Sequence, residues 1–160
     1  MTEVKKEEGT NLPEDNQAFD SVVGSLFFGE IDESAVFPYP HLSADQEEMS
    51  KTMCDAVAKF GEDNIDGEKF DHDKEIPKDV IQGLAELGLC GLAVEEKHGG
   101  MELDYTLYAR VFGEIAALDG STATMLGAHQ SIGYRALINE GNEQQKAEWL
   151  PRLASGEVIA

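Results

Sequence analysis

The sequence predicts an all-α protein, an up-and-down bundle of about five or six helices. Three observations predict this class: apolar residues recur with helical spacing, capping residues precede several of these segments, and glycine or proline separates them. The chain has 160 residues, of which 41% are hydrophobic. That is enough for one domain with a buried core.

The first forty-two residues are expected to hold a leader, a short helix and a connector that lays its aromatic side chains on the body of the main domain. Residues 1–17 have no apolar periodicity and the features of neither a signal nor a transit peptide, so we expect a disordered acidic leader. Residues 18–42 are expected to form a short amphipathic helix that ends near Gly29, followed by a connector that contains Pro38 and Pro40.

The main domain is expected over residues 43–157. Its first helix should begin after Ser43, which forms an S-x-x-Q capping pattern with Gln46, and should end at Gly61. The acidic stretch that follows is expected to be irregular up to Ile76.

A second helix should start at Pro77, with Gly83 allowing close contact with another helix, and should stop at Gly88. Residues 89–94 are apolar and are expected to cross the core as extended chain. Asp104 should cap the next helix.

The C-terminal third is expected to hold a long buried helix and a short one. After a turn at Asp119 and Gly120, Ser121 should cap the long helix; Asn142 should cap a short helix that ends before Pro151. Residues 158–160 resemble the first residues of a β-strand. Since natural folds rarely stop there, the chain is expected to be an N-terminal fragment in which a β-domain is cut off.

Charge limits the classes of partner. The net charge is −20, from 32 acidic and 12 basic side chains. Such a surface repels nucleic acid and anionic lipid, so neither is expected to bind directly, and any membrane association would depend on regions outside this sequence. No apolar run reaches the ~18 residues of a membrane span. Cys54 and Cys90 lack metal-binding spacing and are expected to be small core residues.

Two patterns suggest metal ligands only at first sight. Glu95 and His98 form E-x-x-H, which di-iron bundles carry twice, but it occurs once here and directly before Gly99 and Gly100, where a turn is favoured. His72 stands between two aspartates, yet consecutive side chains diverge, so a solvated loop is favoured.

The long helix over residues 122–139 has small residues in its middle, among them Gly127 and Ala128. Two interpretations are open: another helix packs closely there, or the helix forms the wall of a channel for an extended ligand. His129 has no nucleophile at a suitable spacing and is expected to be a hydrogen-bonded structural histidine.

Three segments carry a family resemblance: VFPYP at 36–40, LGAHQSIG at 126–133 and GNEQQKAEWLPRLASGEVIA at 141–160. They resemble the N-terminal helical domain of the acyl-CoA dehydrogenases, and specifically the very-long-chain branch and its complex I assembly relative. The loop at 95–100 departs from the family, which usually has Pro-Glu-Glu-Tyr-Gly-Gly there.

The resemblance implies a three-part protein in which a β-domain and a C-terminal bundle follow this domain. It implies FAD-dependent α,β-dehydrogenation of long-chain acyl-CoA in mitochondrial fatty acid β-oxidation, electron transfer to electron-transferring flavoprotein, and a homodimer at full length. The catalytic glutamate and the main FAD-binding segment are expected beyond Ala160. We therefore assign no catalytic, cofactor-binding or metal residue, and expect neither tight FAD binding nor turnover from these residues alone.

For substrate contact, the resemblance implies that Thr124, Ala128 and Ile132 line the acyl channel, spaced i, i+4, i+8 on one helix face. Gly127 and Ala128 would leave room for a longer acyl chain. An alternative of another class is a non-catalytic helical interaction module, such as an assembly factor.

Overall fold

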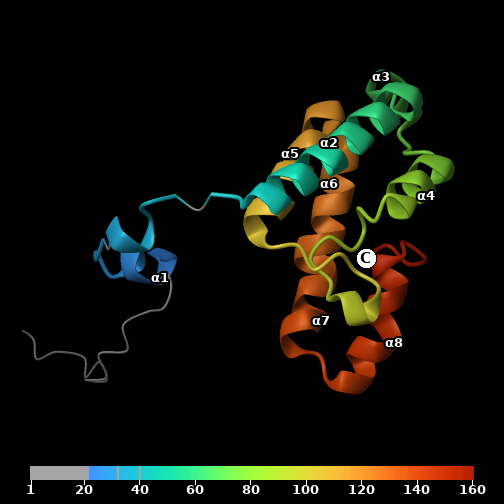
Figure 1. Ribbon diagram of the computed structural model, residues 1–160. Coiled ribbons are helices and arrows are strands. Elements are labelled where there is room, and N and C mark those ends of the chain that lie inside the picture. Colours follow the sequence, from blue (N-terminus) through green and yellow to red (C-terminus); the bar gives the residue numbers. More distant parts are fainter. Residues whose placement is uncertain (1–21, 32, 40) are drawn as a thin grey trace, which may run out of the picture. The chain divides into compact units, whose positions relative to one another are not determined.

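A computed structural model describes residues 22–31, 33–39 and 41–160, and it contains no β-strand among them (Figure 1). The prediction of an all-α fold is confirmed. The expected leader over residues 1–17 lies outside the described residues. The chain divides into two compact units, Met1–Pro40 and His41–Ala160.

The first unit contains the helix α1, Val22–Phe27, and the 3₁₀ turn η1, Glu33–Ala35. Gly29 follows α1 with φ of 77°, the left-handed conformation that favours glycine and that the predicted stop requires. None of the residues of α1 is buried, and Phe27 is 85% exposed. The unit therefore presents apolar side chains at its surface.

The second unit begins with α2, Ala44–Asn64, and the predicted capping box is present. Ser43 Oγ accepts a hydrogen bond from the Gln46 N–H, and Gln46 Oε1 accepts one from the Ser43 N–H. The predicted stop at Gly61 is wrong. The helix continues because Gly61 is buried against Leu118, where its missing side chain permits close packing.

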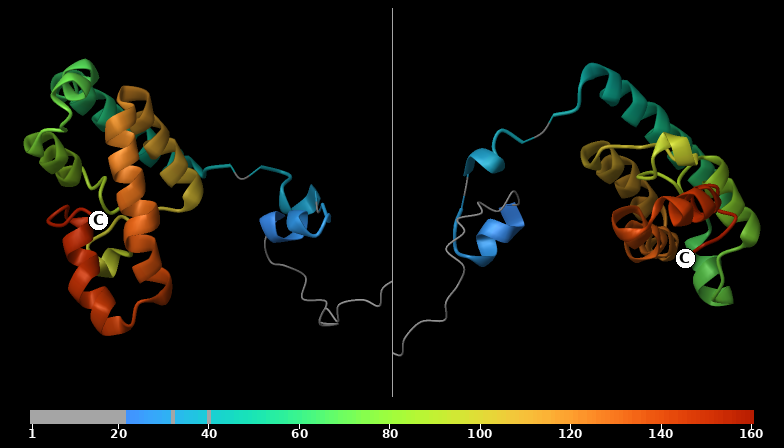
Figure 2. Two further views of the ribbon diagram at one scale, coloured as in Figure 1. Left: turned by 180° about the vertical axis from the view of Figure 1, so that it is seen from behind. Right: turned by 90° about the horizontal axis from the view of Figure 1, so that it is seen from below.

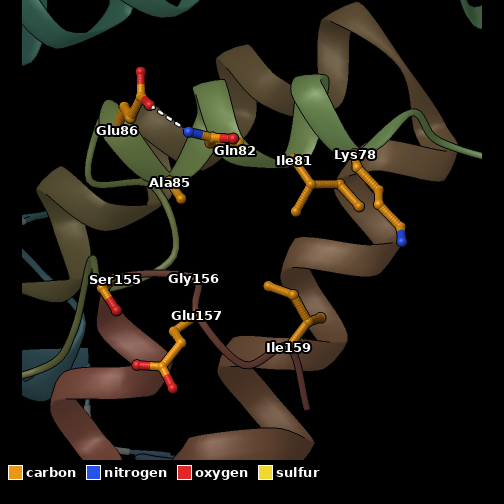
Figure 3. A pocket seen from close by; sticks show the side chains of 9 residues that line it. All are labelled: Lys78, Ile81, Gln82, Ala85, Glu86, Ser155, Gly156, Glu157 and Ile159. Carbon is orange, nitrogen blue, oxygen red and sulfur yellow. Dashed lines mark hydrogen bonds between the residues drawn. The ribbon is translucent and has the colours of Figure 1, made fainter.

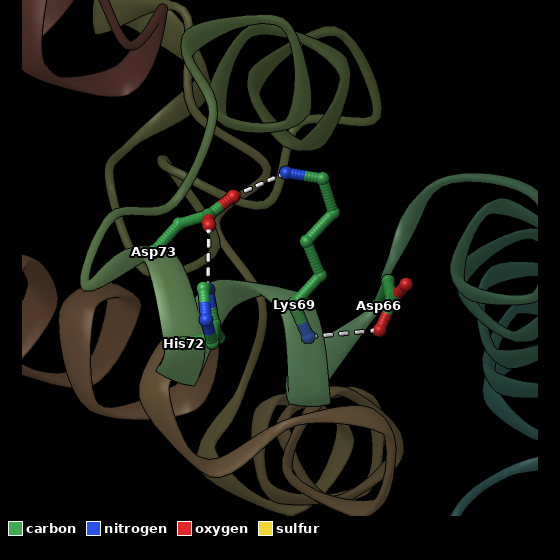
Figure 4. Close-up of polar contacts among 4 residues, drawn as sticks. All are labelled: Asp66, Lys69, His72 and Asp73. Atoms are coloured by element: carbon green, nitrogen blue, oxygen red, sulfur yellow. Dashed lines mark hydrogen bonds and ion pairs between the residues drawn. The ribbon is translucent and has the colours of Figure 1, made fainter.

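The acidic stretch after α2 was predicted to be irregular, and this prediction is wrong. It contains the helix α3, Gly67–Asp73. Asp66 caps this helix by accepting a hydrogen bond from the Lys69 N–H at 3.0 Å (Figure 4). Phe70 is its buried anchor. His72 is exposed on α3, with Nδ1 3.0 Å from Asp73 Oδ1.

After α4, Lys78–Glu86, the chain turns at Gly88 and crosses the core over residues 89–94, the crossing segment. This segment is not the extended chain that was predicted: it is made of consecutive turns, closed by backbone hydrogen bonds from Gly91 to Gly88 and from Val94 to Gly91. Residues 91–94 pair with residues 101–103 through three backbone hydrogen bonds of 2.9 to 3.0 Å. The loop between them holds the 3₁₀ turn η2, Glu96–His98. This pairing satisfies the polar backbone of a buried segment.

The next helix is α5, Tyr105–Leu118, capped by Asp104 as predicted, and it lies beside α2 (Figure 1). The following helix, α6, spans Gly120–Ala128. Its cap is Asp119, whose Oδ2 accepts a hydrogen bond from the Thr122 N–H, so the prediction of a Ser121 cap is wrong. An aspartate directly after one helix can cap the next when the chain turns there.

The predicted long helix is one rod in three parts: α6, a π-helical turn η3 at His129–Gly133, and α7, Tyr134–Glu140 (Figure 2). The last helix, α8, spans Glu143–Ala154 and packs beside α7. Asn142 and Gln145 form the predicted capping box.

The prediction that α8 stops before Pro151 is wrong, because the helix continues through this residue. A proline removes one hydrogen bond within the helix. The last turn of α8 is nevertheless retained, and its residues Leu153 and Ala154 are buried in the core. Residues 158–160 form no strand with any part of the chain that the structure describes.

Two hydrophobic clusters make up the core of the second unit. The larger cluster contains residues of the helices from α2 through α6 and of the crossing segment. Its fully buried members include Leu84, Leu92, Val111, Ile115 and Leu126. The smaller one joins α7, α8 and Val94. The rod of α6, η3 and α7 runs through both clusters, so its middle turn lies where they meet.

The crossing segment generates a stability prediction. A Cβ at Gly100 would lie 2.0 Å from the carbonyl oxygen of Val94, which is backbone and cannot move aside cheaply. We expect Gly100→Ala to lower the free energy of unfolding by about 1–3 kcal/mol in urea titrations. The matched control is Gly113→Ala, at an open site within α5, which should raise stability by about 0.5–1 kcal/mol. Equal effects of the two substitutions would contradict this packing.

Candidate functional site

The rod changes its winding at the π turn, and this change determines which side chains face inward. In an α-helix a spacing of four residues overshoots a full turn by about 40°. A π turn holds more residues than an α turn, as shown by the hydrogen bond from the Tyr134 N–H to the His129 carbonyl oxygen. Two consecutive polar residues of this turn, His129 and Gln130, are both buried.

The His129 ring connects the rod to the C-terminal part of the chain. Its Nε2 lies 3.1 Å from the Leu153 carbonyl oxygen, and its Nδ1 lies 3.1 Å from the Ala160 backbone nitrogen. A carbonyl only accepts and a backbone N–H only donates. The two bonds therefore specify a neutral imidazole with the proton on Nε2. The prediction of a hydrogen-bonded structural histidine is confirmed.

Gln130 and Tyr134 connect the same turn to the crossing segment. The Gln130 side-chain amide donates to the Leu89 carbonyl at 3.2 Å, and the Tyr134 hydroxyl donates to Gln130 Oε1 at 2.9 Å. The hydroxyl also accepts from the Ala93 N–H at 3.4 Å. We call His129, Gln130 and Tyr134 the polar cluster of the rod. All three side chains are buried.

Burial changes the proton affinity of these groups. Loss of water lowers the pKa of His129, and the interaction of the ring with the backbone carbonyls of Leu153 and Cys90 opposes this only in part. Loss of water likewise raises the pKa of Tyr134 and raises that of Cys90 to about 11. All three groups are held neutral near pH 7, as expected of side chains whose role is structural.

The outward face of the rod carries the residues that the sequence singled out. Thr124 is exposed, and its hydroxyl donates to the Gly120 carbonyl at 2.8 Å. Ala128 is half-buried, and Ile132 is 83% exposed. Residues four apart in an α-helix are offset by about 40° around the helix axis. The π turn between Ala128 and Ile132 offsets this pair in the opposite sense. It thereby keeps Thr124 and Ile132 on the side opposite the polar cluster.

Small residues form the middle of this outward face. The backbone of Gly127 lies close to α5, since a Cβ there would be 3.2 Å from Phe112 Cζ. Phe112 stacks on Tyr108 at 5.7 Å between ring centroids, and burial raises the pKa of the Tyr108 hydroxyl. We call Thr124, Gly127, Ala128 and Ile132 the outward face. None of these four residues contributes to the lining of the groove between α4 and residues 155–159 (Figure 3).

Each interpretation of the small residues therefore has one structural observation in its favour. Gly127 does permit close packing against another helix, while Ala128 leaves an open surface beside Ile132. Sequence reasoning missed Gln130 and Tyr134. The signal available was a pair of adjacent polar residues, His129 and Gln130, within an apolar helix.

Neither a metal site nor a membrane span is found in the described part of the chain. There, no group of three or more His, Cys, Asp or Glu side chains is placed to hold a metal ion. Of the E-x-x-H residues, Glu95 precedes the 3₁₀ turn η2 and His98 ends it, and Gly99 follows with a left-handed φ of 82°. Within the same residues no helix combines the length and the apolar character needed to cross a membrane.

The fold and the outward face define a helical domain with an open, small-sided surface, and comparisons identify its class. Residues 44–157 match the model of the family "Acyl-CoA dehydrogenase, N-terminal domain". The chain is 39% identical over 136 residues to the mitochondrial very long-chain specific acyl-CoA dehydrogenase of Rattus norvegicus, covering 84% of this chain and 21% of that protein.

Solved structures agree with this similarity. Butyryl-CoA dehydrogenase from Megasphaera elsdenii matches with a TM-score of 0.62 and 27% identity over 75% of this chain and 32% of its own. A chain from the structure of the electron transferring flavoprotein of Acidaminococcus fermentans matches with a TM-score of 0.65 and 28% identity, over 74% of this chain and 31% of its own. The chain belongs to the acyl-CoA dehydrogenase family. It spans about a fifth of the length of the curated relatives.

The buried histidine generates a pH prediction. The pKa of His129 in the folded chain lies below its unfolded value of about 6.5, so the unfolded chain takes up a proton first as pH falls. The stability that His129 provides is therefore complete above pH 6.5 and is lost below it, at up to about 1.4 kcal/mol per pH unit.

We expect His129→Gln to be less stable than the parent at pH 7 but to lose less stability between pH 7 and pH 5. The measurement is urea unfolding at a series of pH values. His41→Gln, at an exposed histidine, serves as the control and should follow the parent. An unchanged pH slope in His129→Gln would contradict the assignment.

Proposed function

We propose that the outward face is the acyl-contacting wall of a long- or very-long-chain acyl-CoA dehydrogenase. The observation that carries this proposal is the small side chain of the half-buried Ala128 between the exposed residues Thr124 and Ile132, with Gly127 beside it. An acyl chain binds through its methylene groups, each contributing about 0.8 kcal/mol on burial. A surface without long side chains lets many methylenes make contact.

The ring of Phe112 limits how far an acyl chain could enter behind this wall. It lies directly behind Gly127, so an acyl chain along the outward face would rest on Ala128 and could not penetrate between α5 and α6. Ile132 would add apolar contact on the side nearer α7. The 39% identity with a very long-chain relative supports a long substrate.

The complete reaction would need parts of the family's fold that these residues do not contain. FAD-dependence is a property of the family, and FAD would accept hydride from the β-carbon of the acyl-CoA. None of the described residues is assigned to the flavin. Their buried polar atoms without a hydrogen-bond partner, His98 Nε2 and Thr122 Oγ1, are enclosed side-chain atoms. We therefore assign this chain substrate contact and no step of the oxidation.

The same proposal includes the family's wider setting. Long-chain acyl-CoA is the substrate, electron-transferring flavoprotein is the electron acceptor, and the full-length protein is a homodimer. A mitochondrial location is supported by the very long-chain relative. These properties rest on family membership and not on a contact within residues 41–160.

A non-catalytic interaction module is the second candidate function. It is favoured by the first unit, which carries seven of the twelve exposed large hydrophobic side chains found among the described residues. Phe27, Ile31 and Tyr39 are examples, and each is more than 60% exposed. Such side chains, flanked by acidic residues, are suited to a protein partner.

The two candidates predict different ligands for the intact chain. We expect palmitoyl-CoA to shift the methyl resonances of Ala128 and Ile132 in isotope-labelled protein, and Ala128→Phe to weaken binding about tenfold by filling the wall. Ala116→Phe, at an exposed alanine on α5, is the matched control and should bind as the parent does. If palmitoyl-CoA leaves both methyl groups unaffected, the acyl-wall proposal fails and the interaction module is favoured.

A further inference from the structure

A groove separates α4 from the residues that follow α8. Its volume is about 720 Å³, within the range of small-molecule sites. Its apolar lining comes from Ile81, Ala85 and Ile159, and Figure 3 shows Ile81 and Ile159 facing each other across it. No residue of the outward face lines this groove, so it is a separate feature of the second unit.

The two ends of the groove differ in charge. Lys78 lies at one end, near Ile81 and Ile159, while Glu86 and Glu157 lie at the other (Figure 3). Both carboxylates already have partners. Glu86 Oε1 accepts from the Gln82 amide at 3.0 Å, and Glu157 Oε1 pairs with the guanidinium of Arg152 at 2.7 Å.

The Lys78 ammonium, in contrast, forms no ion pair with any residue that the structure describes. Lys78 is also the first residue of α4, a helix of nine residues. The helix dipole therefore adds positive potential at the same end. Asp79 lies in the same first turn and offsets part of this potential, its Oδ1 accepting a hydrogen bond from the Val80 N–H at 3.1 Å. A negative group placed at Lys78 would meet a cation without an ion-pair partner, whereas a positive group at the other end would have to displace an existing partner.

We propose that this groove binds a medium-chain fatty carboxylate. The carboxylate lies at Lys78, and the alkyl chain lies along Ile81, Ala85 and Ile159 toward Ser155. The nine residues of α4 span about 13 Å, which sets the length of chain that the groove covers. Free fatty acid and acyl thioester share the alkyl chain, but only the free acid has a carboxylate at its end. The site thus distinguishes the acid from its thioester.

The experiment uses the whole chain with decanoate, below its micelle concentration, followed by NMR of the isoleucine methyl groups. We expect saturable shifts at Ile81 and Ile159, and weaker binding of decyltrimethylammonium, decanol and decanoyl-CoA. Lys78→Gln should weaken decanoate binding about three- to fivefold, because the ion pair is exposed. Ile159→Asp should weaken it at least about tenfold by replacing apolar contact with a like charge.

Lys51→Gln is the matched control, since it removes an exposed lysine from α2, outside the groove. Decanoate should bind this variant as it binds the parent. The proposal is overturned if decanoate does not saturate, if decyltrimethylammonium or decanoyl-CoA binds equally well, or if Lys78→Gln binds as the control does. Shifts confined to Ile132 would place the ligand on the outward face and also overturn it.

Discussion

The hydrogen bonds made by His129, Gln130 and Tyr134 are the constraint on which the rest of the second unit depends. Buried polar groups are costly when unpaired, about 1–3 kcal/mol each, so these bonds must form together when the core closes. Their partners are backbone groups of two other segments: residues 89–93, and the stretch that runs from the end of α8 to Ala160. One turn of one rod thus fixes both segments.

The same constraint determines the outward face. The π turn holds the two consecutive polar side chains that lie in the core. It also offsets the angle around the helix axis that residues spaced four apart would otherwise accumulate. Thr124 and Ile132 consequently share a side of the rod, with Ala128 between them. A feature that stabilises the core therefore positions the surface to which we assign acyl contact. This link explains how an inert histidine can matter for function.

Local signals predicted much of the fold. The capping boxes at Ser43 and Asn142 were correct, because both partners of each bond lie within four residues. The stop at Gly88 was correct because it depends on the backbone conformation of a single residue. The family resemblance favoured the channel wall over helix packing, a choice that periodicity left open and that stays a prediction.

The errors arose where distant contacts override local preference. Gly61 does not end α2, because Leu118 packs against it, and Pro151 does not end α8, because the residues after it are buried. Helix α3 depends on Phe70, a single anchor in an acidic stretch. The π turn was missed for the same reason: its stabilising partners lie 24 to 41 residues away along the chain.

The most direct test of this account is the tautomer of His129. Long-range proton–nitrogen NMR of the imidazole rings at neutral pH distinguishes a proton on Nε2 from one on Nδ1, and either from the charged ring. The bonds to Leu153 and Ala160 predict a neutral ring protonated on Nε2. A ring protonated on Nδ1, or on both nitrogens, would contradict the claim that the polar cluster holds the domain together.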